Sequence, residues 1–214
     1  MSCFDRDLSL RGLAAWGWQG HDLAMTTPHP TTALLLIDVQ ASFTARPYWR
    51  EDDMHAVLAH SNTLIAGCQA RHIPIVRVFH TDRPDQPDNP FATASGLVRP
   101  LDGLAPFEAA LTVEKHRHSA LVGTGLAVWL HQQGMRRLIV AGIRTEQCCE
   151  TTTRHASDEG WEVDYCLDAT LTFDMATPSG DVLSAAQIRE RTATVLAGRF
   201  ATITSVDEAL ARAA

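Results

Sequence analysis

The chain has 214 residues, of which 45% are hydrophobic and 20% charged, and its formal net charge is -7. This composition excludes a disordered chain, a collagen-like chain and a coiled coil. An acidic chain binds the phosphate backbone poorly, so we predict no nucleic-acid partner. No apolar run approaches the roughly 18–20 residues that span a bilayer, so we predict no membrane partner.

Five short runs along the chain predict strands. Most are continuously apolar, which is typical of strands buried on both faces of a parallel sheet. In chain order they are Ala33–Asp38, Ile73–Phe79, Arg137–Gly142, Glu162–Leu167 and Ala201–Thr204.

Four amphipathic stretches between these runs predict helices: Met54–Arg71, Gly123–Gln133, Cys148–Glu159 and Ser184–Ala197. Gly134 follows the second as a helix stop, and Ser184 opens the fourth as a cap. This alternation predicts an α/β fold with three α-β-α layers and a doubly wound, mainly parallel sheet of about six strands. Active sites in such folds lie beyond the carboxyl ends of the strands.

Two segments interrupt the alternation. His80–Leu104 is rich in Pro, Asp and Gly and is long for a simple connection, so we expect it to line or cover a site. Residues 1–24 precede Met25, a natural start for a domain. We interpret 1–24 as a peripheral N-terminal extension, either a real arm or an upstream translation artefact, and 25–214 as a single domain.

The five cysteines form no CxxC pair, and their number is odd. A disulfide framework or a zinc ribbon is therefore not indicated, and free thiols in a reducing cytoplasm fit better. The predicted localisation is cytoplasmic.

Three residues stand where chemistry is expected, and each has an ordinary alternative. Asp38 ends an apolar strand, either as a functional acid or as a cap for the next segment. Cys148 opens a predicted helix, whose dipole favours a thiolate nucleophile, but lone cysteines are more often small buried hydrophobes. Lys115 is either a solvated surface residue or a cation beside the other two, where it would lower the pKa of the thiol.

Histidines and acids near Lys115 raise the question of a metal. His116 and His118 flank Lys115, and His80 and Asp82 form an HxD pair, but this spacing matches no strong metal-site pattern. The chain has no GxSxG elbow, no GxGxxG after a strand and no GxxxxGK[ST] loop. We therefore predict no metal and no cofactor.

Three motifs, in order, resemble the isochorismatase-like cysteine hydrolase family, which includes nicotinamidases and N-carbamoylsarcosine amidohydrolases. The first is LLLIDVQASF, with its Asp-x-Gln signature. The second is EKHRHSALVGTGLAVWLHQQGMRRLIVAG, with the lysine, Ser-Ala and Gly-Thr. The third is GIRTEQCCETTTRHASDEGWEVDYCLDAT, with the Gly-Ile-x-Thr-x-x-Cys turn. The resemblance extends from residue 33 to about residue 205.

The resemblance implies a role for each residue. Asp38 would be the general base, Lys115 would stabilise the ionised Asp38 and Cys148, and Cys148 would attack a carbonyl carbon. A cis peptide would join Ile143 to Arg144, and the backbone N–H groups of Arg144 and Cys148 would form the oxyanion hole. Cys149 would only pack.

Departures from the family limit what the resemblance implies about the substrate. The segment that corresponds to the metal-binding stretch of nicotinamidases lacks their histidine spacing and reads VFHTDRPDQPDNPF. We therefore predict neither nicotinamide as substrate nor a required metal. Arg144 is unusual, and its guanidinium either clamps a substrate carboxylate or pairs with Glu146 or solvent. Phe43, Tyr48, Trp49 and Phe91 are candidates for the pocket wall, with core packing as the alternative for each. We predict substrate contacts for Phe43, Trp49, Phe91 and Arg144.

The resulting expectation is a cysteine hydrolase that cleaves the C–N bond of a small non-peptide amide or carbamoyl compound through a thioester. The alternatives are hydrolysis of an ether or ester bond, as in isochorismatase itself, and a non-catalytic oligomeric member. The expected partners are a small-molecule amide and further copies of the chain, in a homodimer or homotetramer.

Overall fold

The computed structural model describes residues 30–83 and 86–213, and the predicted extension 1–24 lies outside these residues. At the centre is a parallel sheet of six strands in the order β3-β2-β1-β4-β5-β8. The strands are β1 (Thr32–Ile37), β2 (Ile75–His80), β3 (Leu111–Lys115), β4 (Arg137–Ile143), β5 (Glu162–Leu171) and β8 (Thr202–Thr204). The strand order reverses at β1, between β2 and β4, which is where doubly wound folds bind ligands. The predicted fold class is confirmed.

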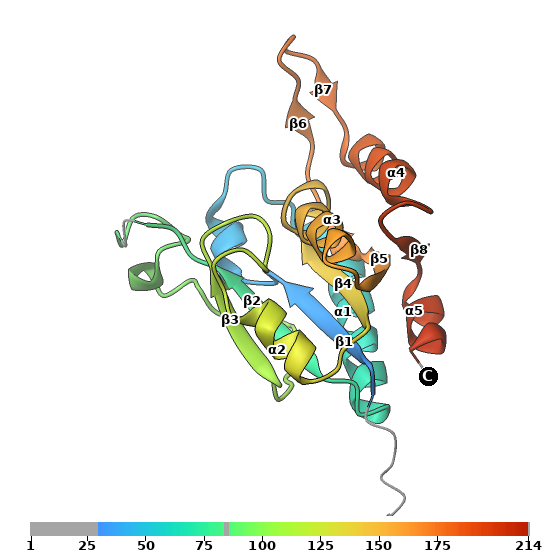
Figure 1. The fold of residues 1–214 in the computed structure, drawn as a ribbon. Coiled ribbons are helices and arrows are strands. Elements are labelled where there is room, and N and C mark those ends of the chain that lie inside the picture. Colours follow the sequence, from blue (N-terminus) through green and yellow to red (C-terminus); the bar gives the residue numbers. More distant parts are fainter. Residues whose placement is uncertain (1–29, 84–85, 214) are drawn as a thin grey trace, which may run out of the picture.

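Helices cover both faces of this sheet. They are α1 (Glu51–Ala70), α2 (Leu126–Gln132), α3 (Glu150–Asp158), α4 (Ala185–Leu196) and α5 (Val206–Arg212). Alternate residues of β1 divide the core: Leu34 and Leu36 pack with α1 and α5, whereas Leu35 and Ile37 pack with α2, α3 and α4. Figure 1 shows α2 and α3 in front of the sheet and α1 behind it.

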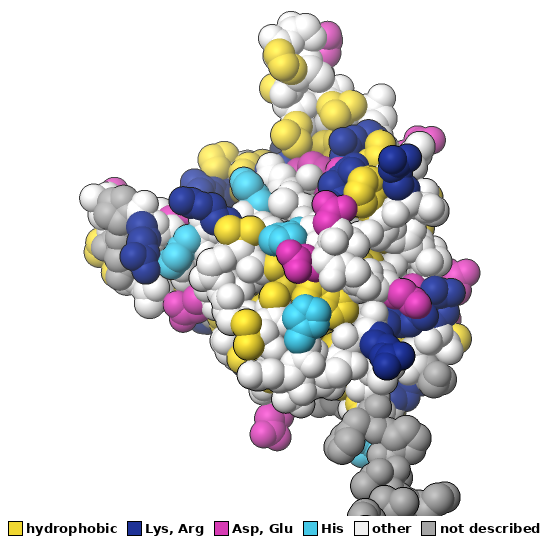
Figure 2. Space-filling view, in the orientation of Figure 1, with side chains coloured by type: hydrophobic (Ala, Val, Ile, Leu, Met, Phe, Trp, Pro, Cys, Tyr) yellow, Lys and Arg dark blue, Asp and Glu magenta, His cyan; other side chains and the backbone are white. Residues whose placement is uncertain are grey.

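A two-stranded hairpin stands apart from the sheet. β6 (Met175–Ala176) pairs antiparallel with β7 (Val182–Leu183), and the hairpin projects from the body in Figure 1. Met175, Val182 and Leu183 are exposed, and Figure 2 shows hydrophobic side chains along the projection. No helix within the described residues has the length and apolar character needed to cross a membrane.

Gly142 sets how closely the two central strands approach. It pairs with Ile37 of β1 and has a φ of 131°, a value that L side chains rarely adopt. A Cβ atom at this position would lie 1.9 Å from the carbonyl oxygen of Ile37. Glycine at this position therefore allows the ends of β1 and β4 to pair closely. The segments that follow these two strands then start next to each other.

Candidate active site

The three residues singled out in the sequence meet at the carboxyl ends of the strands. Asp38 follows β1 with a φ of 53°, Lys115 is the last residue of β3, and Cys148 lies in a π-helical turn (Thr145–Cys149) after β4. Asp and Asn tolerate this left-handed conformation better than most residues. Asp38 and Lys115 are fully buried, and Cys148 is 7% exposed.

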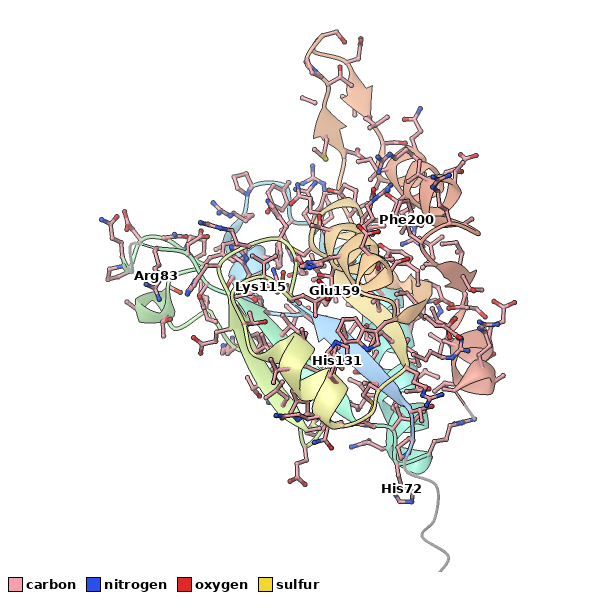
Figure 3. The ribbon with its side chains drawn as sticks, in the orientation of Figure 1. His72, Arg83, Lys115, His131, Glu159 and Phe200 are labelled. Carbon is pink, nitrogen blue, oxygen red and sulfur yellow. The ribbon has the colours of Figure 1, made fainter. Side chains whose placement is uncertain are left out.

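The ammonium group of Lys115 joins the other two residues. Its Nζ lies 2.8 Å from Oδ2 of Asp38 and donates to Sγ of Cys148 at 3.3 Å. Figure 3 labels Lys115 inside the molecule rather than on its outline. Burial alone would lower the pKa of Lys115, but the charges of Asp38 and Cys148 raise it above its usual range. Lys115 is therefore a cation at neutral pH.

The thiol of Cys148 is protonated at rest, whereas a position at the start of a helix favoured a thiolate. Burial is the main cause that raises its pKa, to about 12, and the Asp38 carboxylate raises it further. Lys115 acts in the expected direction and lowers it, but less strongly. Cys148 also lies inside the π-helical turn rather than opening α3, so the predicted helix start is two residues too early. A thiolate therefore forms here only when a base removes the thiol proton.

His80 continues the network on the other side of Lys115. Its Nδ1 lies 3.2 Å from Nζ of Lys115, and its Nε2 lies 2.9 Å from Oδ1 of Asp82. Burial, followed by the charge of Lys115, lowers the pKa of His80. A neutral His80 accepts from Lys115 at Nδ1 and donates to Asp82 from Nε2–H. Asn89 donates to the second oxygen of Asp82 at 3.2 Å.

The HxD motif thus orients the lysine. Asp38, His80 and Cys148 bring possible metal-ligand atoms within 4.8 Å of one another. Nζ of Lys115 lies within 3.3 Å of an atom of each of them, so an ammonium group already stands among these ligands.

Gln40, the third residue of the Asp-x-Gln signature, fixes the spacing of β1 and β2. Its Nε2 donates to the carbonyl of His80 at 3.0 Å, and its Oε1 accepts from the N–H of His80 at 2.8 Å. Because Gln40 is fully buried, water does not compete for these bonds. These two bonds hold the end of β2 against the segment after β1, so His80 and Asp38 lie in the same site.

The turn that carries Cys148 is anchored to β5. The peptide bond between Ile143 and Arg144 is cis, as the resemblance implies. The hydroxyl of Tyr165 donates to the carbonyl of Thr145 at 2.7 Å, and Oγ1 of Thr145 donates to Oγ1 of Thr170 at 2.9 Å. Cys149 is fully buried in the core beneath the turn. The sequence pattern alone did not indicate the roles of Tyr165 and Thr170.

A cavity of about 220 Å³ opens above the thiol. The residues that line it are Asp38, Phe43, Arg46, Tyr48, His80, Asp82, Phe91, His118, Gln147 and Cys148. Phe43 and Phe91 thus lie where the sequence analysis placed them, with their rings edge to face and 5.0 Å apart. The cavity is smaller than the roughly 300–1,000 Å³ of sites for drug-sized ligands, so it has room for a small ligand only.

Two of the predicted substrate contacts lie elsewhere. Trp49 borders a separate hollow with Met54 and Leu58. Arg144 is buried, pairs with Glu146 at 2.9 Å, lies 5.1 Å from the ring centre of Tyr48 and is not among the residues that line the cavity. Of the two alternatives for Arg144, the structure therefore shows the pair with Glu146 and not a position on the cavity wall.

Arg46 and Gln147 line the cavity but were not singled out in the sequence, and His118, weighed there only as a possible metal ligand, lines it too. Nδ1 of His118 lies 3.8 Å from Sγ of Cys148. Arg46 directly follows a 3-10 helix (Ala41–Ala45), and a second short 3-10 helix (Thr93–Ser95) lies beyond Phe91. These positions depend on loop conformation, which periodicity does not report.

The isochorismatase domain model matches residues 32–206, which is most of the chain and includes every residue of the site. The chain belongs to the isochorismatase family. The bounds of this match agree with the resemblance found in the sequence, which extends from residue 33 to about residue 205.

Relatives of this isochorismatase-family chain include hydrolases with different names. Nicotinamidase 3 of Arabidopsis thaliana is 29% identical over 66% of this chain and 74% of its own length. Streptothricin hydrolase of Streptomyces noursei is 29% identical over 73% of this chain and 63% of its own length. The crystal structure of an isochorismatase from Pseudomonas putida matches with a TM-score of 0.73 and 28% identity, covering 84% of this chain and 90% of that one.

Proposed function

We propose that this chain is a cysteine hydrolase that cleaves the C–N bond of a small non-peptide amide or carbamoyl compound. The observation that carries the proposal is the buried contact of one ammonium, Lys115, with both the Asp38 carboxylate and the Cys148 thiol at the floor of a cavity. The name of the Arabidopsis relative, nicotinamidase, denotes an amide-cleaving enzyme and supports the reaction class.

The first half-reaction forms a thioester. Asp38 takes the proton of the Cys148 thiol, and the thiolate sulfur bonds to the carbonyl carbon of the substrate. The carbonyl electrons move to oxygen, where the N–H groups of Arg144 and Cys148 are proposed to stabilise the oxyanion. The oxyanion collapses, the C–N bond breaks, and Asp38 returns the proton to the departing nitrogen.

The second half-reaction hydrolyses the thioester. Asp38 takes a proton from water, and the resulting hydroxide adds to the thioester carbon. The C–S bond breaks, the acid product leaves, and the proton on Asp38 returns to Cys148. Lys115 stays charged throughout and offsets the negative charge that moves between Asp38 and Cys148.

A panel of small amides, ureas and carbamoyl compounds tests the proposal through ammonia release. We expect Cys148→Ala to abolish turnover, because no thioester forms without the sulfur. Cys149→Ala is the matched control, since its thiol is buried in the core and does not line the cavity.

The outcomes of the panel separate the candidate functions. Turnover lost only in Cys148→Ala supports the amidohydrolase. A vinyl ether acid is assayed beside the panel by release of its own product, and release that survives Cys148→Ala favours ether hydrolysis instead. Absence of turnover on every compound favours a binding role, and loss in Cys149→Ala alone moves the nucleophile to Cys149.

A further inference from the structure

Arg46 is a cation on the cavity wall with no carboxylate of its own. Its backbone N–H donates to the carbonyl of Phe43 at 2.9 Å, which fixes the main chain at this point. Its guanidinium lies 5.0 Å from the ring centre of Phe91, and both residues line the cavity above Cys148. Cation–π contact with Phe91 holds the guanidinium in place without neutralising it.

The two carboxylates of the cavity have other partners than Arg46. Asp38 is neutralised by Lys115, and Asp82 accepts hydrogen bonds from His80 and Asn89. The charge of Arg46 is close enough to help lower the pKa of Asp82. However, within the part of the chain that the structure describes, no carboxylate oxygen lies within the 4.0 Å of an ion pair with Arg46.

A half-buried guanidinium without a carboxylate partner is suited to a bidentate anion, above all a carboxylate. We infer that the substrate is a small amide that carries a carboxylate, and that Arg46 binds this carboxylate while the amide carbonyl lies against Cys148. The inference rests on the proposed function and adds its substrate class. Phe43 and Phe91 line the same cavity as Arg46 and Cys148, so we expect a short apolar spacer between the carboxylate and the amide.

Dicarboxylic acid monoamides provide the test, because each has a neutral counterpart of nearly the same shape. Succinamic and glutaramic acids carry the carboxylate, whereas succinamide and glutaramide carry a second amide in its place. We expect kcat/KM of the wild type to be roughly 10- to 100-fold higher for the acids, as for a hydrogen bond between charged groups.

Variants of Arg46 assign the preference to its guanidinium. Arg46→Gln should reduce the acid-over-diamide ratio to near one, chiefly by raising KM for the acid. Arg46→Lys should restore part of it, because an ammonium keeps the charge but not the fork of donors. Arg50→Gln removes a nearby cation that does not line the cavity and should keep the full ratio.

Three results would overturn the inference. A wild type that prefers the diamides, or an Arg46→Gln variant that keeps the wild-type ratio, removes Arg46 as the specificity residue. Ammonia release that depends on Cys148 would then still support the proposed function. If neither the acids nor the diamides release ammonia, the proposed function is overturned for these amides, and this inference is overturned with it.

Discussion

At the scale of single residues, the site is organised around a protonated thiol. A Cys148 pKa of about 12 means that little thiolate exists at neutral pH, so the lysine alone does not activate the nucleophile. Asp38 raises the thiol pKa at rest, yet in the proposed mechanism it is also the base that takes the proton. In the proposed mechanism, the thiolate therefore forms when a substrate is attacked rather than in the resting enzyme.

The opposing charges of Asp38 and Lys115 give opposite predictions for thiol reactivity. Asp38→Asn removes a charge that raises the thiol pKa, so alkylation of Cys148 by iodoacetamide at pH 8 should become faster. Lys115→Met removes a charge that lowers it, so alkylation should become slower. Each unit of pKa change alters the thiolate fraction about tenfold. Equal alkylation rates in the three proteins would contradict this electrostatic account.

Turnover of the same two variants should fall together, in contrast to alkylation. Loss of a general base typically costs about 10²–10⁴-fold, and we expect Asp38→Asn to lie in this range. Steady-state ammonia release measures it on any substrate found by the panel. An Asp38→Asn variant that alkylates faster and also turns over at the wild-type rate would exclude Asp38 as the base.

His80 gives the fold a pH dependence of known sign. Its folded-state pKa lies below the unfolded value of about 6.5, so the unfolded chain binds more protons as the pH falls. The stability associated with neutral His80 is thus present above about pH 6.5 and is lost as the pH falls through the lowered pKa. Urea unfolding at pH 7.5 and pH 5.5 should show a smaller change for His80→Asn than for the wild type. Equal changes would contradict the prediction.

At the scale of elements, the sequence located the strands whose ends carry Asp38 and Cys148 but not the strand of Lys115. β1 and β4 are continuous apolar runs, which identify buried strands directly. β3 lies at the sheet edge, and its pattern LTVEK places a lysine on the buried side, so it does not resemble a strand by composition. Only the family resemblance brought Lys115 to the site.

The hairpin and the last helix escaped prediction for a related reason. β6 and β7 have only two residues each, and α5 has seven. None is long enough to show the periodic spacing of apolar residues that identifies a strand or a helix. The register shift between Val140 and Gly142 also lets β5 run on to Leu171, four residues beyond the predicted end. Cavity residues such as Arg46 lie in loops and are positioned by tertiary contacts rather than by local pattern.

Gly142 is the element-scale position most sensitive to change. Gly142→Ala would place a methyl group 1.9 Å from the carbonyl oxygen of Ile37, so β1 and β4 would have to separate. We expect the free energy of unfolding to fall by about 3 kcal/mol or more, measured by urea denaturation. Gly134→Ala is the control, because its φ of 66° is also positive but its Cβ would meet open space. Similar losses in both variants would assign the effect to backbone strain alone.

At the scale of the whole molecule, the sheet order brings residues from distant segments to one edge. The reversal at β1 places β2 and β4 on either side of it, so the residues after β1 and β4 meet those at the ends of β2 and β3. The relatives of this chain bear different names, nicotinamidase and streptothricin hydrolase, so membership of the family does not by itself give the substrate.

The assembly of the chain stays a prediction. A single chain has a mass of 23.4 kDa, and we expect sedimentation to give twice or four times this value, for a homodimer or homotetramer. Closed symmetric assemblies are the commonest form of soluble oligomers. A monomeric mass across the micromolar range would contradict the expectation.

The covalent intermediate on Cys148 is the central claim, and acid quenching tests it most directly. The wild type is mixed with an amide that it hydrolyses, stopped in acid within one turnover, digested and analysed by mass spectrometry. We predict that the peptide containing Cys148 gains the mass of the acyl group, and that the adduct is absent from Cys148→Ala. Turnover at the wild-type rate in Cys148→Ala, or an acyl group found on another residue, would contradict the account.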